Sequence, residues 1–167
     1  MDEDKKKWTL RMIPYGIYVM TAKDVDGNVG ARTVNWVTQT SFAPPLVAIG
    51  VKIDSELYAR VKVAGQFALN LLGKGQQRIA FGFFKPLEVD GNVISGEPVS
   101  YGANGAPLLD SAPAAIECVV AEIVELGDHH IVVGKVTEVH QAQLPGGRPD
   151  EAILKMKELG DNVFYGG

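Results

Sequence analysis

A chain of 167 residues with 46 % hydrophobic and 22 % charged residues has the size and composition of one globular domain, which excludes disorder as its main state. Its 16 basic and 20 acidic residues give a net charge of -4, so the composition predicts no basic face for nucleic acid. No apolar run reaches the roughly 18 to 20 residues that span a membrane, and the start MDEDKKKW lacks an apolar signal segment. We therefore expect a single cytoplasmic domain over residues 1–167, with no membrane segment and with residues 1–10 as a flexible N-terminal segment.

The first part of the chain has the pattern of β-strands separated by turns. Residues 14–23, PYGIYVMTAK, are rich in β-branched and aromatic residues, and the following DVDGNVG has the Asp-Gly chemistry of a tight hairpin turn. The second arm is predicted from about Ala31 to Phe42. Pro44 and Pro45 end its hydrogen-bonded part because proline has no backbone donor, and LVAIGVKI then predicts a third strand.

Two short helices and a fourth strand follow. In SELYARVKVAG, the apolar parts of Leu57, Arg60 and Val61 recur at helical spacing, with a Ser at the N-cap and a Gly after the end. QFALNLL predicts the fourth strand and GQQRIAFGFF the second helix. The segment from about Lys85 to Leu109 is predicted to be a loop, because it contains four glycines and three prolines.

The last third of the chain predicts two long strands, AAIECVVAEIVEL and HIVVGKVTEVHQ, joined by the turn-sized GDH. Val132 and Val136 fall on one face of the second strand. Ile131, Val133 and Val139 fall on the other, so we expect both faces to be substantially buried. A curled, mostly antiparallel sheet closed into a barrel, with short helices and a partner subunit outside it, buries both faces most simply.

Residues that invite a redox or metal interpretation have plainer explanations. Cys118 is the only cysteine and lies among strand residues, so we interpret it as a small core residue and not as a reactive thiol. His129 and His130 are neighbours on a strand and point to opposite faces, so they do not ligate one ion together. No second cysteine or carboxylate cluster completes a site, and the sequence predicts no metal.

Residues 33–47, TVNWVTQTSFAPPLV, place Asn, Thr, Gln and Ser among the apolar residues of a strand. Taken alone, this pattern is typical of a strand with one solvated face, and Trp36 alone is more typical of a core residue. The order of motifs along the chain gives the run another meaning. A hairpin is followed by NWVTQTSFAPPLVAIGV, FALNLL, GAPLL, IECVV, GDHHIVVGKV and a terminal FYGG.

This order and spacing, from about Met12 to Gly167, resemble the flavin-reductase-like, FMN-binding split-barrel family. The resemblance implies a mostly-β fold, a six-stranded antiparallel split β-barrel with short flanking helices. It also implies a homodimer with FMN held near the subunit interface. Composition and periodicity alone predict only the barrel.

The resemblance also implies how the polar strand meets FMN. The flavin ring is edged with hydrogen-bond donors and acceptors and carries a polyol chain, so short polar side chains suit both parts. The residues implied to line the ring and the ribityl chain are Asn35, Trp36, Val37 and Thr38, with Ser41 nearby.

By the same resemblance, Lys52 and Ser55 meet the phosphate, and Lys85 is a second candidate. Asp54 departs from this picture because it puts a carboxylate beside the expected phosphate. Either Asp54 points away, or backbone N–H groups and the positive end of the helix beginning near Ser55 hold the phosphate. No dinucleotide fingerprint of the GxGxxG type is present.

The resemblance further implies that His129 lies near the flavin and positions the nicotinamide, and that Phe164 and Tyr165 reach the flavin near the subunit contact. His129 alone is also explained as a turn residue that satisfies carbonyl groups, and His130 is then an outward or packing residue. The expected function is reduction of bound FMN by NADH or NADPH, with electrons passed to an acceptor. The alternatives are a flavoredoxin-like FMN carrier served by a redox protein, and FMN-dependent reduction of a small organic substrate.

Overall fold

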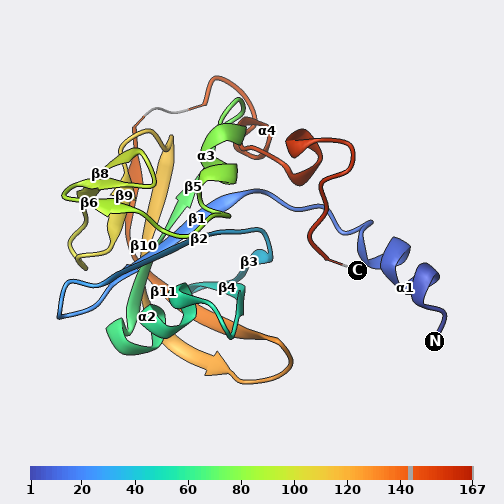
Figure 1. Ribbon diagram of the computed structural model, residues 1–167, viewed down its shortest axis with the longest axis horizontal. Helices are drawn as coiled ribbons and strands as arrows, with labels where there is room; N and C mark the ends of the chain where they lie inside the picture. Colours follow the sequence, from blue (N-terminus) through green and yellow to red (C-terminus); the bar gives the residue numbers. More distant parts are fainter. Residues whose placement is uncertain (143–144, 167) are drawn as a thin grey trace.

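The computed structural model describes residues 1–142 and 145–166 (Figure 1). Its main sheet has seven strands in the order β2-β1-β5-β10-β11-β4-β3, and each neighbouring pair is antiparallel. This confirms the predicted mostly-β class with short helices. The strands are β1 (Tyr18–Lys23), β2 (Val29–Val34), β3 (Val37–Phe42), β4 (Pro45–Lys52), β5 (Gln66–Leu71), β10 (Ala114–Val124) and β11 (His129–Gln141).

The sheet curls because a very short link joins its two edges. β2 and β3 stand at opposite ends of the hydrogen-bonded order, yet only Asn35 and Trp36 separate them in sequence. Three consecutive Cα–Cα steps span at most about 11 Å, so the two edges must come close together. The result is an open barrel, split between β2 and β3. The predicted second arm, Ala31–Phe42, therefore divides in two, which gives seven strands instead of six.

The inside of the curl is filled by apolar side chains from the sheet and from α2 (Glu56–Ala64). Met20, Phe67 and Val132 are fully buried there together with Leu57 of α2. Cys118 belongs to the same cluster, and burial raises the pKa of its thiol to about 12. The predicted core role of this cysteine is confirmed.

Both predicted helices are present. α2 begins after Ser55, whose Oγ accepts a hydrogen bond from the N–H of Tyr58 at 3.1 Å, and it ends at Gly65 with φ 65°. α3 (Gln77–Gly82) lies beside β2, where the Thr33 hydroxyl donates to the Ala80 carbonyl at 2.7 Å. None of the helices in the described ranges is long and apolar enough to cross a membrane.

Three further helical segments were not predicted. α1 (Glu3–Leu10) covers most of the segment expected to be flexible, contains no buried residue, and extends away from the barrel (Figure 1). α4 (Pro149–Ala152) and the 3-10 helix η1 (Met156–Leu159) belong to the C-terminal segment.

The prediction of a loop from Lys85 to Leu109 was wrong. This segment forms a second sheet of four short strands, β6 (Val89–Asp90), β7 (Val93–Ile94), β8 (Glu97–Tyr101) and β9 (Pro107–Leu109). Glycines in the turns, such as Gly91 with φ 58°, had suggested a loop. The buried Asn70 side chain ties this small sheet to the main one, because it donates to the Val19 carbonyl at 3.1 Å and accepts from the Leu109 N–H at 2.8 Å.

The C-terminal segment is joined by backbone hydrogen bonds to the chain around the start of β1. Ile17 donates to the Leu154 carbonyl at 2.8 Å, and Leu154 donates to the Leu72 carbonyl at 2.8 Å. Met156 donates to the Tyr15 carbonyl at 3.0 Å. These bonds bring the end of the chain, red in Figure 1, alongside the N-terminal segment.

The prediction that both faces of the last strand are buried was wrong for the single chain. Val132 is fully buried, but on the other face Ile131 is 41 % exposed. A bulge in β11 pairs Val139 with Ile116 and so places Val139 on the face of Val132, not on that of Ile131; Val139 is 63 % exposed there.

Candidate functional site

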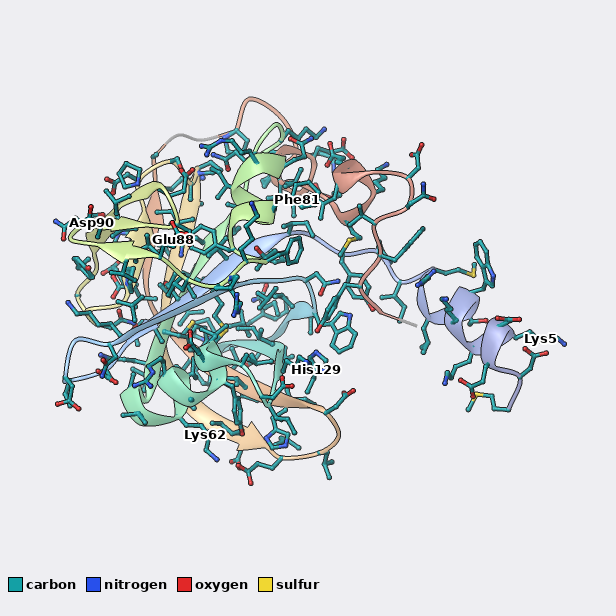
Figure 2. The ribbon with its side chains drawn as sticks, viewed as in Figure 1. Lys5, Lys62, Phe81, Glu88, Asp90 and His129 are labelled. Carbon is teal, nitrogen blue, oxygen red and sulfur yellow. The ribbon has the colours of Figure 1, made fainter. Side chains whose placement is uncertain are left out.

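A pocket of about 150 Å³ opens where the barrel is split. Residues from β2, β4, the β2–β3 link and the C-terminal segment line it, because the curl brings both sheet edges to this place. In Figure 2, His129 lies on the side of the barrel facing the two terminal segments, whereas Glu88 and Asp90 lie on the opposite side. The apolar lining residues are Ile17, Val34, Val51, Leu57, Phe84 and Met156, and the polar ones include Arg32, Thr33, Asn35, Lys52, Ser55, His129 and Tyr165.

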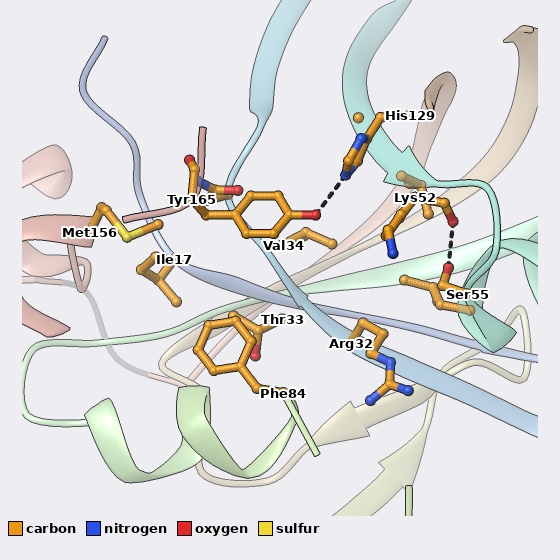
Figure 3. A pocket seen from close by; sticks show the side chains of 14 residues that line it. Ile17, Arg32, Thr33, Val34, Lys52, Ser55, Phe84, His129, Met156 and Tyr165 are labelled. Carbon is orange, nitrogen blue, oxygen red and sulfur yellow. Dashed lines mark hydrogen bonds between the residues drawn. The ribbon is translucent and has the colours of Figure 1, made fainter. Parts of the chain in front are cut away.

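The two ends of this pocket differ in chemistry (Figure 3). Arg32, Lys52 and Ser55 lie at one end, and Ile17 and Met156 lie at the other. The pocket therefore suits a ligand with one anionic end and an apolar body, and it favours one orientation of that ligand.

At the cationic end, Lys52 Nζ lies 3.0 Å from Asp54 Oδ2, and this hydrogen bond raises the pKa of Lys52. Asp54, the residue that departed from the expected pattern, thus pairs with Lys52. Arg32 was missed by the sequence analysis. Alternation along β2 places it on the face of Val34, two residues later, and this period was the signal that could have found it. Lys85 does not line the pocket, but its backbone carbonyl accepts a hydrogen bond from Arg32.

Ser55 lines the pocket, but its hydroxyl is occupied locally. It donates to the Lys52 carbonyl at 2.7 Å and accepts from the N–H of Tyr58 at 3.1 Å. Its position at the N-cap directs the positive end of α2 toward the cationic end of the pocket. An anion there would therefore meet the helix terminus as well as the side chains.

His129 is held from both of its ring nitrogens. Nδ1 lies 2.9 Å from Asp128 Oδ1 and Nε2 lies 2.6 Å from the Tyr165 hydroxyl (Figure 3). The Asp128 carboxylate accepts a hydrogen bond from the Nδ1–H group, and in this tautomer Nε2 accepts a hydrogen bond from the Tyr165 hydroxyl. The hydrogen bond from His129 lowers the pKa of Asp128. The imidazole is thereby fixed in tautomer and direction.

Trp36 lies behind this pair and contacts both rings. Its ring centroid is 4.6 Å from that of His129 and 5.5 Å from that of Tyr165. The Trp36 carbonyl accepts from the Gly50 N–H at 2.9 Å, which fastens the link to β4. The indole Nε1 is buried and has no hydrogen-bond partner among the described residues. Buried hydrogen-bond donors without a partner are uncommon in folded proteins.

The end of the chain lies across the pocket. Asn35 Nδ2 donates to the Tyr165 carbonyl at 3.2 Å, and Arg11 Nε donates to the Gly166 carbonyl at 3.1 Å. The Arg11 guanidinium also stands 4.5 Å from the centroid of the Phe164 ring. Burial raises the pKa of the Tyr165 phenol. The tail is therefore attached at several points and carries Tyr165 to His129.

The remaining predicted residues lie outside this pocket. Val37, Thr38 and Ser41 are on β3, and Val37 is paired with Ile49 of β4. Phe164 lines a neighbouring cavity instead. Trp36 is not a lining residue either, because it lies behind His129 and Tyr165. The sequence analysis therefore found Asn35, Lys52, Ser55, His129 and Tyr165 among the lining residues, and missed the others, which include Ile17, Arg32, Phe84 and Met156.

His130 points away from the pocket. Its Nδ1 is hydrogen-bonded to the Tyr58 hydroxyl, and the two rings meet edge to face with centroids 5.2 Å apart. Within residues 1–142 and 145–166, no group of three or more His, Cys, Asp or Glu side chains is placed to hold a metal ion.

Residues 10–151 match the family model described as flavin reductase like domain. The chain belongs to this family. It is 32 % identical over 130 residues to a flavin reductase of Pseudomonas putida, a match that covers 78 % of this chain and 75 % of that protein. The solved structure of an NADH:FAD oxidoreductase from Streptomyces globisporus superposes with a TM-score of 0.67 at 30 % identity, covering 77 % of this chain and 76 % of that chain.

Some relatives are much longer. Diflavin flavoprotein A 1 of Synechocystis sp. is 34 % identical over 148 residues, which is 87 % of this chain but 25 % of that protein. The chain spans from a quarter to just over half of the first curated relatives that it matches, at 25 %, 41 % and 56 % of their lengths.

The group that this family implies is a flavin, and the pocket residues fit one. Arg32 and Lys52 offer charge to a phosphate, and Asn35 offers an amide. Trp36 does not line the pocket, and its buried Nε1 is a donor without a partner among the described residues. The volume of about 150 Å³ is below the range of about 300 to 1,000 Å³ usual for ligand pockets. Because Tyr165 lies across the space, a flavin ring requires this side chain to move.

Proposed function

We propose that this chain is a flavin reductase domain that holds FMN in the pocket at the barrel split, uses NADH or NADPH as donor, and passes electrons to an acceptor. The observation that carries the proposal is the pocket itself, with cations at one end, an apolar body, and an oriented histidine beside it. Membership in the flavin reductase like family supports the same reaction.

We assign the phosphate to the end formed by Arg32, Lys52 and the N-terminus of α2. Arg32 is held by the Lys85 carbonyl, so Lys85 acts through its backbone. Asn35 would hydrogen-bond the flavin once the Tyr165 carbonyl has left it. Two cations beside the N-terminus of α2 suit a single phosphate group, and this supports FMN as the flavin.

The β3 residues have a supporting role in this proposal. Val37, Thr38 and Ser41 hold β3 against β4 and so keep Trp36 in place behind the ring site. Trp36 would form a wall of the site.

A flavin bound here would supply the redox chemistry, by accepting two electrons and a proton from the nicotinamide and delivering the electrons onward. The protein must hold the two reactants in contact and exclude competing orientations. We assign this positioning to His129, because Asp128 fixes its tautomer and its Nε2 faces the pocket where Tyr165 now binds.

The decisive experiment identifies the flavin and its donor. Purified protein, or protein given flavin, should be yellow and should release FMN on denaturation, as read by chromatography. Anaerobic stopped-flow mixing with NADH or NADPH should bleach the flavin band. A colourless protein that takes up neither FMN nor FAD would overturn the proposal.

A flavoredoxin-like carrier is the second candidate, and the match to a quarter of a longer flavoprotein favours considering it. Such a domain would receive its electrons from a redox protein and would show no bleaching with either nicotinamide. Reduction of a small organic substrate on the same flavin is the third candidate. Either would use the same pocket.

We further propose that the chain works as a homodimer in the cytoplasm, where nicotinamide donors are available. The exposed face of the β10–β11 pair supports this, because Val119 and Ile131 lie on that one face and leave apolar surface exposed in the single chain. A second copy would cover this face with the same pair of strands.

A further inference from the structure

A second and larger cavity adjoins the flavin pocket. Its volume is about 640 Å³, and it lies between the residues preceding β1 and the C-terminal segment. Met156 and Tyr165 line both spaces, so the two cavities meet at these side chains. The proposed flavin site makes no use of this second cavity.

Three cationic side chains line it, those of Arg11, Lys155 and Lys157. Arg11 uses its Nε on the Gly166 carbonyl. Lys155 Nζ lies 3.8 Å from a Glu151 oxygen, at the limit of an ion pair. Lys157 is exposed and forms no ion pair with any residue that the structure describes. Lys157 thus offers its charge to a ligand.

Two acids also line the cavity. Asp150 is already paired with Arg148 at 2.9 Å, whereas Asp161 is exposed and leaves one carboxylate against the three cations. The rest of the wall is largely apolar or aromatic and includes Ile13, Tyr15, Ile153, Val163 and Phe164.

This combination suits an adenosine diphosphate group. The cavity lies within the range of about 300 to 1,000 Å³ that holds small ligands. Aromatic and apolar side chains can contact the base, and ammonium and guanidinium groups can bind the phosphates. Two dinucleotides could bring such a group here, the nicotinamide donor or FAD.

The arrangement of the flavin pocket favours the nicotinamide donor over FAD as the source of this adenosine diphosphate group. Arg32, Lys52 and Ser55 mark the phosphate end, and the second cavity joins at the other end, next to Met156 and Tyr165 (Figure 3). The adenosine half of FAD would leave from the phosphate end and away from this cavity. A donor that approaches the ring would place its own adenosine half in the cavity.

We propose that the second cavity binds the adenosine diphosphate half of the nicotinamide donor, with Lys157 and Lys155 as its phosphate ligands. The assignment rests on the proposed function. Tyr165 separates the two halves of the site, and the nicotinamide would reach His129 when the tyrosine leaves it.

Binding of ADP-ribose, which lacks the nicotinamide, tests the cavity without any reaction. Isothermal titration of the whole chain should give saturable binding, and Lys157→Glu should weaken it about tenfold or more, since a charge-assisted bond is replaced by repulsion. Lys74→Glu is the matched control, because Lys74 is exposed and lies outside both cavities. FMN binding should be equal in all three proteins. Absence of ADP-ribose binding, or equal weakening by both variants, would overturn the proposal.

A second comparison separates the two dinucleotides. Lys157→Glu should raise the KM for NADH about tenfold, yet leave the KM for reduced nicotinamide mononucleotide unchanged because that donor has no adenosine half. A variant that weakens FAD relative to FMN while ADP-ribose binds normally would assign the cavity to FAD and refute the proposal. If ADP-ribose binds as expected but no donor reduces the flavin, the reductase function fails and the adenosine site remains.

Discussion

At the scale of single residues, the site consists of a few groups whose neighbours decide what they can bind. Arg32 is braced by the Lys85 carbonyl, whereas Lys52 shares its charge with Asp54 at 3.0 Å and has a side chain 55 % exposed. An exposed and already paired cation contributes less to ligand binding than a braced one. Arg32 should therefore be the stronger phosphate ligand.

Arg32→Ala should weaken FMN at least tenfold and should affect riboflavin much less, because riboflavin carries no phosphate. A charge-assisted hydrogen bond contributes about 1.5 to 3 kcal/mol, which corresponds to roughly tenfold or more. Lys52→Ala should give a smaller loss of the same kind. Fluorescence titration with both ligands measures this, with Lys85→Ala as control since only its backbone takes part. Equal losses for FMN and riboflavin would indicate a structural role instead.

His129 and His130 are adjacent residues with different surroundings. His129→Ala should slow flavin reduction by NADH about tenfold or more, as removal of a positioning group does, while FMN stays bound. His130→Ala should leave the rate unchanged, because its ring contacts Tyr58 on the far side of the strand. Single-turnover stopped-flow traces compare the two. If flavin is reduced at the parent rate in both variants, His129 has only a structural role in its turn.

At the scale of elements, the C-terminal tail is the part of the site that must move. It is attached through Asn35, Arg11 and the bond from Tyr165 to His129, and it passes over the pocket that we assign to the flavin. Each attachment is a hydrogen bond of modest net strength, so the tail can leave without unfolding the barrel.

Tyr165→Phe removes the hydroxyl bonded to His129 and keeps the ring against Trp36. The lost bond contributes about 0.5 to 1.5 kcal/mol to the covered state, so FMN association should become about two- to tenfold faster. Quenching of FMN fluorescence on rapid mixing gives the rate. Tyr101→Phe is a suitable control because Tyr101 lies on β8, outside this pocket. An association rate equal to that of the parent would mean that the tyrosine does not limit entry.

At the scale of the whole molecule, the exposed apolar face of the β10–β11 pair is the feature that supports the proposed dimer. Val119 is 44 % exposed and Ile131 is 41 % exposed on the same face of the long β10–β11 pair, which one chain leaves open to solvent. If two copies meet here near the flavin, dilution that separates them should also release FMN, and excess FMN should favour the dimer.

Val119→Glu should shift the chain toward monomer, because it places a charge in the proposed apolar contact. Val25→Glu, at a hairpin position that is 96 % exposed, should change nothing. Light scattering and flavin fluorescence across one dilution series follow both equilibria. A parent protein that is monomeric at every concentration and keeps its FMN would contradict the dimer.

Local patterns in the sequence determined much of this protein. The mostly-β class, α2 and the core position of Cys118 could be predicted, because each depends on residues that are close in sequence. These local features are the strand alternation, the Asp-Gly turn, the Ser55 cap and the apolar neighbours of Cys118. The same patterns misled at residues 85–109, where glycines in tight turns between very short strands were interpreted as a loop. The order of motifs along the chain led to Asn35, Lys52 and His129, because that order indicates the family and periodicity does not.

Only the tertiary structure decided how those residues meet. The break at Asn35 and Trp36 is invisible in a continuous strand pattern, because it follows from the need to join two edges of one curled sheet. Arg32 faces the pocket only because that curl brings β2 toward β4. Tyr165 lies 36 positions from His129, and the hydrogen bonds of the C-terminal segment to the chain near Ile17 carry it there. Contacts between such distant residues depend on the whole folded chain, which is why sequence patterns with short range do not contain them.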